Sequence, residues 1–415
     1  MTASRWASVF SPFAVRSFRF QWSADLVTSW AFEMENVLLG WYIVVKTQSV
    51  LMVTLYGTMQ FLGTLIAPFF GLAGDRLGQR TVICAIRACF VALSSVGTLL
   101  TLTDNLSPVL VLVIAGVGGL VRPSDTGIRN LLIAETIPPG ILMRAISLSR
   151  ITQDSARAAG ALASGAIVLV LGMSVAYPVA VAFYALGALL SFGAGVPRPV
   201  RTHPLPKLSP FGDLRDAARA VWQHPQQLAA MIMAFALNMT AFPFTLGLLP
   251  YVARDVYGTT QAGLGYMVAA VACGSIVASV ITTARAGSLS PARTMLVCSL
   301  VWHALLVVFG QVHGLAGGLV LLGLIGLAQM MCMLPLSLLL LRSAPVALRG
   351  RIMGMRTLAV YGLPIGLLGT GPLIDTLGFP ATATLYGLAG TLATLAVLVR
   401  WREHLWARDA EANSG

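Results

Sequence analysis

The sequence predicts an all-α polytopic membrane protein. Of its 415 residues, 57% are hydrophobic and only 10% are charged, with a mean hydropathy of +0.82. A soluble domain carries roughly 25% charged residues. Apolar runs recur along the whole chain, and each is long enough as a helix to cross roughly 30 Å of hydrocarbon. Because no water in the bilayer core can bond to the backbone, helices are the structure that such runs form.

The apolar runs define twelve predicted transmembrane helices. They cover residues 21–45, 51–73, 81–103, 108–132, 145–171, 175–196, 226–250, 261–284, 292–312, 316–341, 352–374 and 378–400. Short polar or glycine-containing segments separate most of these runs. An even number of spans places both chain ends on the same side of the membrane.

The loops differ strongly in basic residues, and this difference predicts the orientation. One set of loops and ends carries Arg5, Arg16, Arg19, Arg76, Arg80, Arg144, Arg198, Arg201, Lys207, Arg215, Arg219, Arg285, Arg293, Arg342, Arg349, Arg351, Arg400, Arg402 and Arg408. The opposite set carries only Lys46 and Arg254. Because cytoplasmic loops are enriched in Lys and Arg, we expect both termini to be cytoplasmic, in a bacterial-type inner (plasma) membrane.

A long hydrophilic segment, residues 197–225, predicts the division of the chain. It separates an N-terminal six-helix bundle, residues 1–196, from a C-terminal bundle and tail, residues 226–415. Within it, Ser209 and Pro210 have the order of a helix N-cap and first turn, and Phe211, Leu214 and Val221 recur at helical spacing. We therefore expect a short amphipathic helix on the cytoplasmic membrane surface.

A weak internal repeat agrees with two related halves. Gly160 and Gly165 recur as Gly366 and Gly371, an offset of 206 residues (366 − 160). Prolines and arginines of residues 139–150 and 345–356 recur at nearly the same offset. Duplicated halves are a recurring architecture of membrane transporters.

Residues 71–80 form a charged, glycine-punctuated turn between spans two and three. Gly71, Asp75, Arg76, Gly78 and Arg80 match the cytoplasmic signature that the major facilitator superfamily carries at this place in its topology. The chain resembles that superfamily over essentially its full length. The resemblance implies two six-helix bundles around a central cavity, alternating access, and a turn that acts as a latch at the cytoplasmic end of the second half.

Two further stretches narrow the resemblance. The run from Pro345 to Arg351, and Arg122 followed by Pro123 and Ser124, are similar to bacterial exporters related to siderophore (enterobactin-type) and multidrug efflux. This similarity implies a small-molecule substrate that leaves the cell.

Span one carries the polar residues most suited to coupling. Charges inside a bilayer cost about 2.5–3.5 kcal/mol each on insertion scales, so each needs a reason. Asp25 and Asn36 lie eleven residues apart, close to three helical turns, and share a face, whereas Glu33 and Glu35 point to roughly opposite sides. A low dielectric disfavours the charged form of a carboxyl group and so raises its pKa, which is what a proton-coupling group requires. Asp25, Glu33, Glu35 and Asn36 are therefore candidates for proton or substrate coupling, and ion pairing in a purely structural role is the alternative.

Spans four and five each carry charges on one helical face. The sets are Arg122, Asp125 and Arg129 in span four, and Arg150, Asp154 and Arg157 in span five. We expect Asp125, Arg129, Arg150, Asp154 and Arg157 to form a charge network that closes the cytoplasmic side. Arg122 lies deepest of these charges. It is a candidate for binding an anionic substrate or for modulating the charge state of a span-one carboxylate. For Arg87 in span three we expect an acidic structural partner.

The sequence lacks the signals of nucleic-acid-binding proteins, metalloproteins, ATP-driven proteins and enzymes. The net charge of +12 is spread singly between apolar runs, which argues against nucleic-acid binding. The five cysteines lie inside apolar runs with no Cys-x-x-Cys, so we expect no metal site. No phosphate-binding loop motif is present, so ATP is not the expected energy source, and we expect no cofactor. His404 and Asp409 have an acyltransferase-like spacing but follow the last span, so we expect no enzyme.

These observations lead to one functional expectation with two alternatives. We expect a monomeric secondary active transporter that exports a small amphipathic or anionic organic molecule in exchange for protons. A uniporter or a proton symporter for uptake is the first alternative. A membrane receptor or assembly protein that keeps the fold without transporting is the second.

The latch expectation gives a first prediction. Asp75→Asn removes the charge of the signature turn and should lower transport turnover while leaving folding and substrate binding intact. Initial transport rates in proteoliposomes, together with equilibrium binding, measure the two effects. Turnover equal to that of the wild type would contradict the latch.

Overall fold

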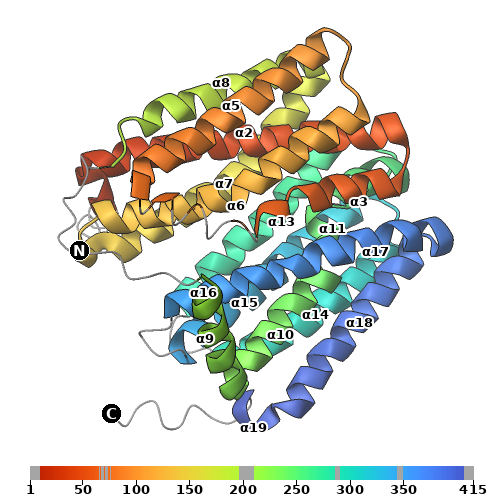
Figure 1. Ribbon diagram of the computed structural model, residues 1–415. Coiled ribbons are helices and arrows are strands. Elements are labelled where there is room, and N and C mark those ends of the chain that lie inside the picture. The colour runs from red at the N-terminus through yellow and green to blue at the C-terminus, as the bar shows by residue number, and fades with distance from the viewer. Residues whose placement is uncertain are drawn as a thin grey trace. The chain divides into compact units, whose positions relative to one another are not determined.

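The computed structural model describes residues 10–64, 66, 70, 73, 74, 76–195, 210–285, 290–343 and 349–405. Within these ranges the regular secondary structure is helical and contains no strand, so the predicted all-α class is confirmed (Figure 1). By contacts the chain divides into two units. Unit 1 comprises residues 1–48, 59–204 and 259–269, and unit 2 comprises residues 49–58, 205–258 and 270–415. The predicted linker at 197–225 stays a prediction.

Unit 1 is built around its first long helix. Its elements are η1 (Ser11–Ala14), α2 (Arg16–Thr47), η2 (Leu62–Thr64), α5 (Gln79–Leu102), α6 (Pro108–Thr136), α7 (Pro139–Leu171) and α8 (Met173–Ser191). Helix α2 packs against α6, α7 and α8, and α5 packs against α6 and α8. The charged side chains of α2 are therefore surrounded by other helices.

Unit 2 holds the remaining elements. They are α3 (Val50–Met59), α9 (Pro210–Gln223), α10 (Pro225–Thr240), α11 (Phe242–Leu246), α12 (Leu249–Tyr251), the π-helical turn η3 (Val252–Val256), α13 (Gln261–Ala284), α14 (Pro291–Gln311), α15 (Leu315–Ser343), α16 (Arg349–Leu358), η5 (Ala359–Tyr361), α17 (Gly362–Leu377), α18 (Phe379–Arg400) and α19 (Arg402–Leu405). The first residues of α13 and the last residue of α3 group with unit 1.

In the described part of the chain, nine helices are long and apolar enough to cross a membrane, and Val50–Thr64 is a shorter apolar helix. Two further predicted spans take other forms. Helix α2 has 32 residues but carries Asp25, Glu33 and Glu35, and α10 has only 16 residues before the chain turns into α11. The number twelve therefore stays a prediction.

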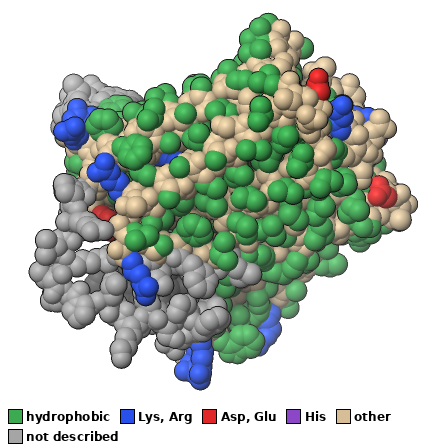
Figure 2. All heavy atoms as spheres, turned by 45° about the horizontal axis from the view of Figure 1, so that its top comes forward, with side chains coloured by type: hydrophobic (Ala, Val, Ile, Leu, Met, Phe, Trp, Pro, Cys, Tyr) green, Lys and Arg blue, Asp and Glu red, His purple; other side chains and the backbone are tan. Residues whose placement is uncertain are grey.

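Large apolar side chains cover much of the protein surface. Leu99 is 62% exposed, Val170 77% and Val399 71%. In the view of Figure 2, hydrophobic side chains cover most of the visible face and charged side chains lie near its edges. A soluble monomer rarely exposes such an extended apolar surface, which suits contact with lipid.

Backbone contacts through glycine hold helices of unit 2 together. A Cβ atom on Gly274 of α13 would overlap the carbonyl oxygen of Gly323 in α15 and would lie 2.8 Å from the amide nitrogen of Leu327. A Cβ atom on Gly326 would likewise overlap the carbonyl oxygen of Val271. Small residues permit this approach, which supplies packing where the hydrophobic effect cannot.

This contact predicts a stability difference between two glycines. Gly274→Val should lower the melting temperature in detergent by several degrees, because overpacking costs about 1–3 kcal/mol. Gly127→Val in α6 is the matched control, since a Cβ atom at Gly127 would have no neighbour within 4 Å. Equal melting temperatures for the two variants would contradict the close packing of α13 on α15.

Candidate functional site

The polar side chains of α2 meet different partners in unit 1. Asp25 meets α5 and α6, Glu33 meets α7, and Glu35 meets α8. Asn36 meets Gln60, which follows α3. The predicted coupling residues therefore do not form one cluster, and each has its own partners.

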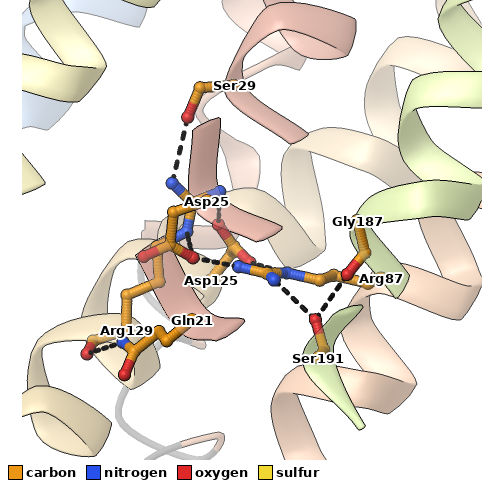
Figure 3. Close-up of polar contacts among 8 residues, drawn as sticks. All are labelled: Gln21, Asp25, Ser29, Arg87, Asp125, Arg129, Gly187 and Ser191. Carbon is orange, nitrogen blue, oxygen red and sulfur yellow. Dashed lines mark hydrogen bonds and ion pairs between the residues drawn. The ribbon is translucent and has the colours of Figure 1, made fainter. Parts of the chain in front are cut away.

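Two acids and two arginines form a buried ionic cluster between α2, α5 and α6 (Figure 3). Arg129 lies 2.5 Å from Asp125 and 3.4 Å from Asp25, and Arg87 lies 3.6 Å from Asp125 and donates a hydrogen bond to Asp25. All four side chains are at most 7% exposed. The expectation of an acidic partner for Arg87 is confirmed, and the cluster carries no net charge.

Neutral groups complete the bonding around the cluster. Arg87 donates to the Ser191 hydroxyl of α8 at 2.5 Å, and Arg129 donates to the Ser29 hydroxyl at 3.1 Å. The Gln21 amide donates to the Arg129 carbonyl at 2.9 Å (Figure 3). The cluster therefore ties α2, α5, α6 and α8 together, and Asp25, proposed for coupling, lies inside it.

Glu33 is paired with an arginine of span five. Its carboxylate lies 3.5 Å from Arg157, and the side chains are 11% and 32% exposed. Gly160 makes room for this approach, since a Cβ atom there would lie 3.0 Å from that of Glu33. In the same helix, Arg150 and Asp154 pair with each other at 3.6 Å. The expected cytoplasmic network of Asp125, Arg129, Arg150, Asp154 and Arg157 stays a prediction.

Glu35 lies between two tyrosines of α8. Tyr177 donates to one carboxylate oxygen at 3.0 Å and Tyr184 donates to the other at 2.9 Å. Both tyrosines are at most 2% exposed. Gly97 of α5 leaves space for the Tyr177 hydroxyl, which a Cβ atom there would overlap. As expected from their spacing, Glu33 and Glu35 face different helices.

Arg122 is part of a chain of polar contacts that reaches Asn36. Its guanidinium lies over the Phe32 ring, 3.1 Å from the ring centroid, and donates to the Gln60 side-chain oxygen at 3.1 Å. Gln60 in turn donates to the Asn36 side-chain oxygen at 2.8 Å. Ser29, Phe32 and Asn36 therefore lie on one side of α2 and meet residues of α6 or Gln60.

The signature turn is described only in part. Gly71 and Asp75 lie outside the described residues. Gly78 has a φ of +91°, a backbone conformation that favours glycine, and Arg76 and Arg80 are exposed. Arg80 donates to the Phe192 carbonyl after α8, so this end of the turn is fixed to unit 1.

The sequence prediction missed five residues of these sites: Gln21, Gln60, Tyr177, Tyr184 and Ser191. The two tyrosines lie seven residues apart in one span, a spacing that places them on one helical face. Gln60 is a single amide in an otherwise apolar run. Among the described residues no group of three or more His, Cys, Asp or Glu side chains forms a metal site.

The ionic cluster predicts a large stability effect. Arg87→Met leaves the two acids facing one arginine, which should destabilise the protein by about 3–5 kcal/mol. Arg150→Met is the matched control, because Arg150 is 59% exposed and such pairs contribute about 0–1 kcal/mol. Unfolding by SDS titration in mixed micelles measures the stability of both variants. Equal losses of unfolding free energy would contradict the stabilising role of the buried cluster.

Comparisons with known proteins identify the family. The family model for transmembrane secretion effectors matches residues 7–414, nearly the whole chain. The multidrug efflux pump Tap of Mycolicibacterium fortuitum is 26% identical over 343 residues, which are 80% of this chain and 81% of that protein.

Solved transporter structures share the fold. The POT family transporter PepTSo has a TM-score of 0.73 at 12% identity, over 95% of this chain and 99% of that one. The human organic anion transporter MFSD10 has a TM-score of 0.65 at 15% identity, over 92% and 99%. The chain therefore belongs to the transmembrane secretion effector family of the major facilitator superfamily, and it is a multi-pass membrane transporter, not an enzyme.

Proposed function

We propose that this transporter exports small amphipathic or anionic organic molecules in exchange for protons, by alternating access. The Glu33–Arg157 pair is the observation that carries the proposal. It joins a nearly buried carboxylate to an arginine that is about one-third exposed. An ionisable residue inside a membrane span is by default a candidate for an ion or substrate pathway.

The pair can exist in two charge states that suit the two halves of a transport cycle. Ionised Glu33 is neutralised by Arg157 at 3.5 Å. A proton on Glu33 cancels its charge and releases Arg157, whose side chain is 32% exposed. Substrate then moves outward with Glu33 ionised, and the empty transporter returns with Glu33 protonated.

The remaining charged groups take supporting roles in this proposal. Asp25, Glu35, Asn36 and Arg122 are the other candidates for coupling or substrate contact. Two groups of residues close the cytoplasmic side. The first is the charge network of Asp125, Arg129, Arg150 and Asp154, and the second is the signature turn of Gly71, Asp75, Arg76, Gly78 and Arg80. Both termini face the cytoplasm and the protein works as a monomer in the inner membrane.

The relatives support export of organic molecules. Tap is a multidrug efflux pump, which favours the outward direction and a broad substrate range. Proton symport or uniport is the second candidate, and one observation favours symport. An anion that bound Arg157 would leave Glu33 unpaired, so that anion and proton would bind together.

The proposal predicts the behaviour of a single variant. Glu33→Gln mimics the protonated state permanently. Because substrate crosses only with Glu33 ionised in the proposed cycle, the variant should lose both concentrative transport and exchange of substrate across the membrane. Proteoliposomes with a lumenal pH dye, fluorescent β-naphthoate and ethidium as probes, and an imposed pH gradient measure both activities.

Glu403→Gln, at an exposed position beyond the last long helix, is the matched control and should behave as the wild type. Unchanged concentrative transport by Glu33→Gln would reject its assigned role. Net substrate movement without any change of lumenal pH would reject proton coupling altogether.

A further inference from the structure

Helices α9 and α19 lie at one end of unit 2, where α10 begins and α18 ends (Figure 1). Both short helices pack on α10. The Gln226 side chain of α10 donates a hydrogen bond to the His404 carbonyl of α19 at 2.8 Å. Val221 of α9 and Leu405 of α19 are only 1% and 2% exposed. Each short helix is therefore anchored in unit 2 by an apolar side chain.

The exposed side of α9 carries arginine and tryptophan. Arg215, Arg219 and Trp222 follow one another at spacings of four and three residues, which place them on one side of the helix. Both arginines are exposed, and Trp222 is 76% exposed. Because Val221 is buried, the last turn of α9 has a packed side and an open side.

The end of α18 repeats the combination of arginine and tryptophan. Arg400 is the last residue of α18, and its guanidinium lies 5.5 Å from the centroid of the Trp401 ring. Arg402, the first residue of α19, is exposed. We call Arg219, Trp222, Arg400 and Arg402 the basic corner of unit 2.

The arginines of the basic corner are available to a ligand. Over the part of the chain that the structure describes, no ion pair or hydrogen bond involves the side chains of Arg219, Arg400 or Arg402. A guanidinium binds a phosphate group through two parallel hydrogen bonds. The chemistry of the corner therefore suits a phosphate-bearing anion.

The exposed tryptophan favours a lipid over a soluble anion. Tryptophan is enriched at the ends of membrane helices, where its amphipathic ring lies at the level of the lipid headgroups. A soluble phosphate would use the arginines alone and leave Trp222 in water. A phospholipid joins a phosphate to apolar chains and can contact both kinds of side chain. Val399, which precedes Arg400 and is 71% exposed, adds apolar surface at the same end of α18.

We propose that an anionic phospholipid binds the basic corner, with its headgroup phosphate on Arg219 and Arg402 and the first part of its acyl chains beside Trp222. The bound lipid holds α9 and α19 at this end of unit 2 and stabilises the protein. The inference is independent of the direction and the coupling of transport.

The charge of the two segments favours an anionic lipid. In α9 and residues 399–405, four arginines outnumber three acids, Asp213, Asp216 and Glu403. Because this excess is small, the preference for an anionic over a zwitterionic lipid rests on the exposed pair Arg219 and Arg402. Each arginine near an anionic lipid surface contributes about a fivefold gain in binding.

Lipid binding to the purified full chain tests the proposal, measured by native mass spectrometry with added lipid. Phosphatidylglycerol should bind the wild type about tenfold more tightly than phosphatidylcholine, which has the same phosphate but no net charge. Arg219→Gln combined with Arg402→Gln should remove this preference. Arg144→Gln combined with Arg285→Gln, which changes two exposed arginines outside the corner, is the matched control and should keep it.

The tryptophan is tested separately, because its contribution does not depend on charge. Trp222→Ala should weaken the binding of both lipids by the same factor, whereas the double arginine variant should weaken only the binding of phosphatidylglycerol. Equal binding of the two lipids to the wild type, or an undiminished preference in the double arginine variant, would overturn the proposal. Unchanged binding of both lipids by Trp222→Ala would overturn the contact assigned to Trp222.

Thermal melting in detergent distinguishes a lipid from a free anion. Phosphatidylglycerol should raise the melting temperature of the wild type by several degrees and should leave that of the double arginine variant unchanged. Without lipid the variant should melt with the wild type, which shows that it is folded. Stabilisation of the wild type by sodium phosphate, at an ionic strength at which sodium chloride has no effect, would overturn the lipid site. Neither assay involves transport, so a failure of proton exchange in proteoliposomes would not affect these results.

Discussion

Neutralisation of buried charge is the constraint on which unit 1 depends. A bilayer offers no water to a charged side chain, so every acid and every arginine between the helices needs a partner within the protein. Asp25 and Asp125 are paired with Arg87 and Arg129, and all four are nearly inaccessible to solvent. These contacts decide which helices surround α2, because an arginine on any other helix would leave a buried charge unpaired.

The same constraint separates fixed charges from charges that can change. The ionic cluster is buried, multiply bonded and electrically balanced, so it serves best as a rigid joint. Among the described residues, Glu33 pairs with one arginine that is partly exposed, and Glu35 has two neutral hydroxyl donors in place of a cation. Arg122 is bonded to a neutral amide and stacked on an aromatic ring. Asp25 and Asp125 each face two arginines, so the cluster acids are the most strongly neutralised of these carboxylates.

Glycine supplies the second element of the architecture. Three pairs of segments approach each other through backbone atoms. They are helices α13 and α15, the segment after α3 with helix α6, and helices α3 and α17. Such contacts hold helices firmly without polar groups.

The sequence by itself determined the all-α membrane class, because hydropathy and run length depend on composition alone. Helical periodicity also predicted that Glu33 and Glu35 point to different sides of α2. The tertiary structure alone decided the partners: Tyr177 and Tyr184 for Glu35, Arg157 for Glu33, and Gln60 between Asn36 and Arg122. Periodicity fixes the direction of a side chain about its own helix axis. It does not say which helix, distant in the sequence, lies in that direction.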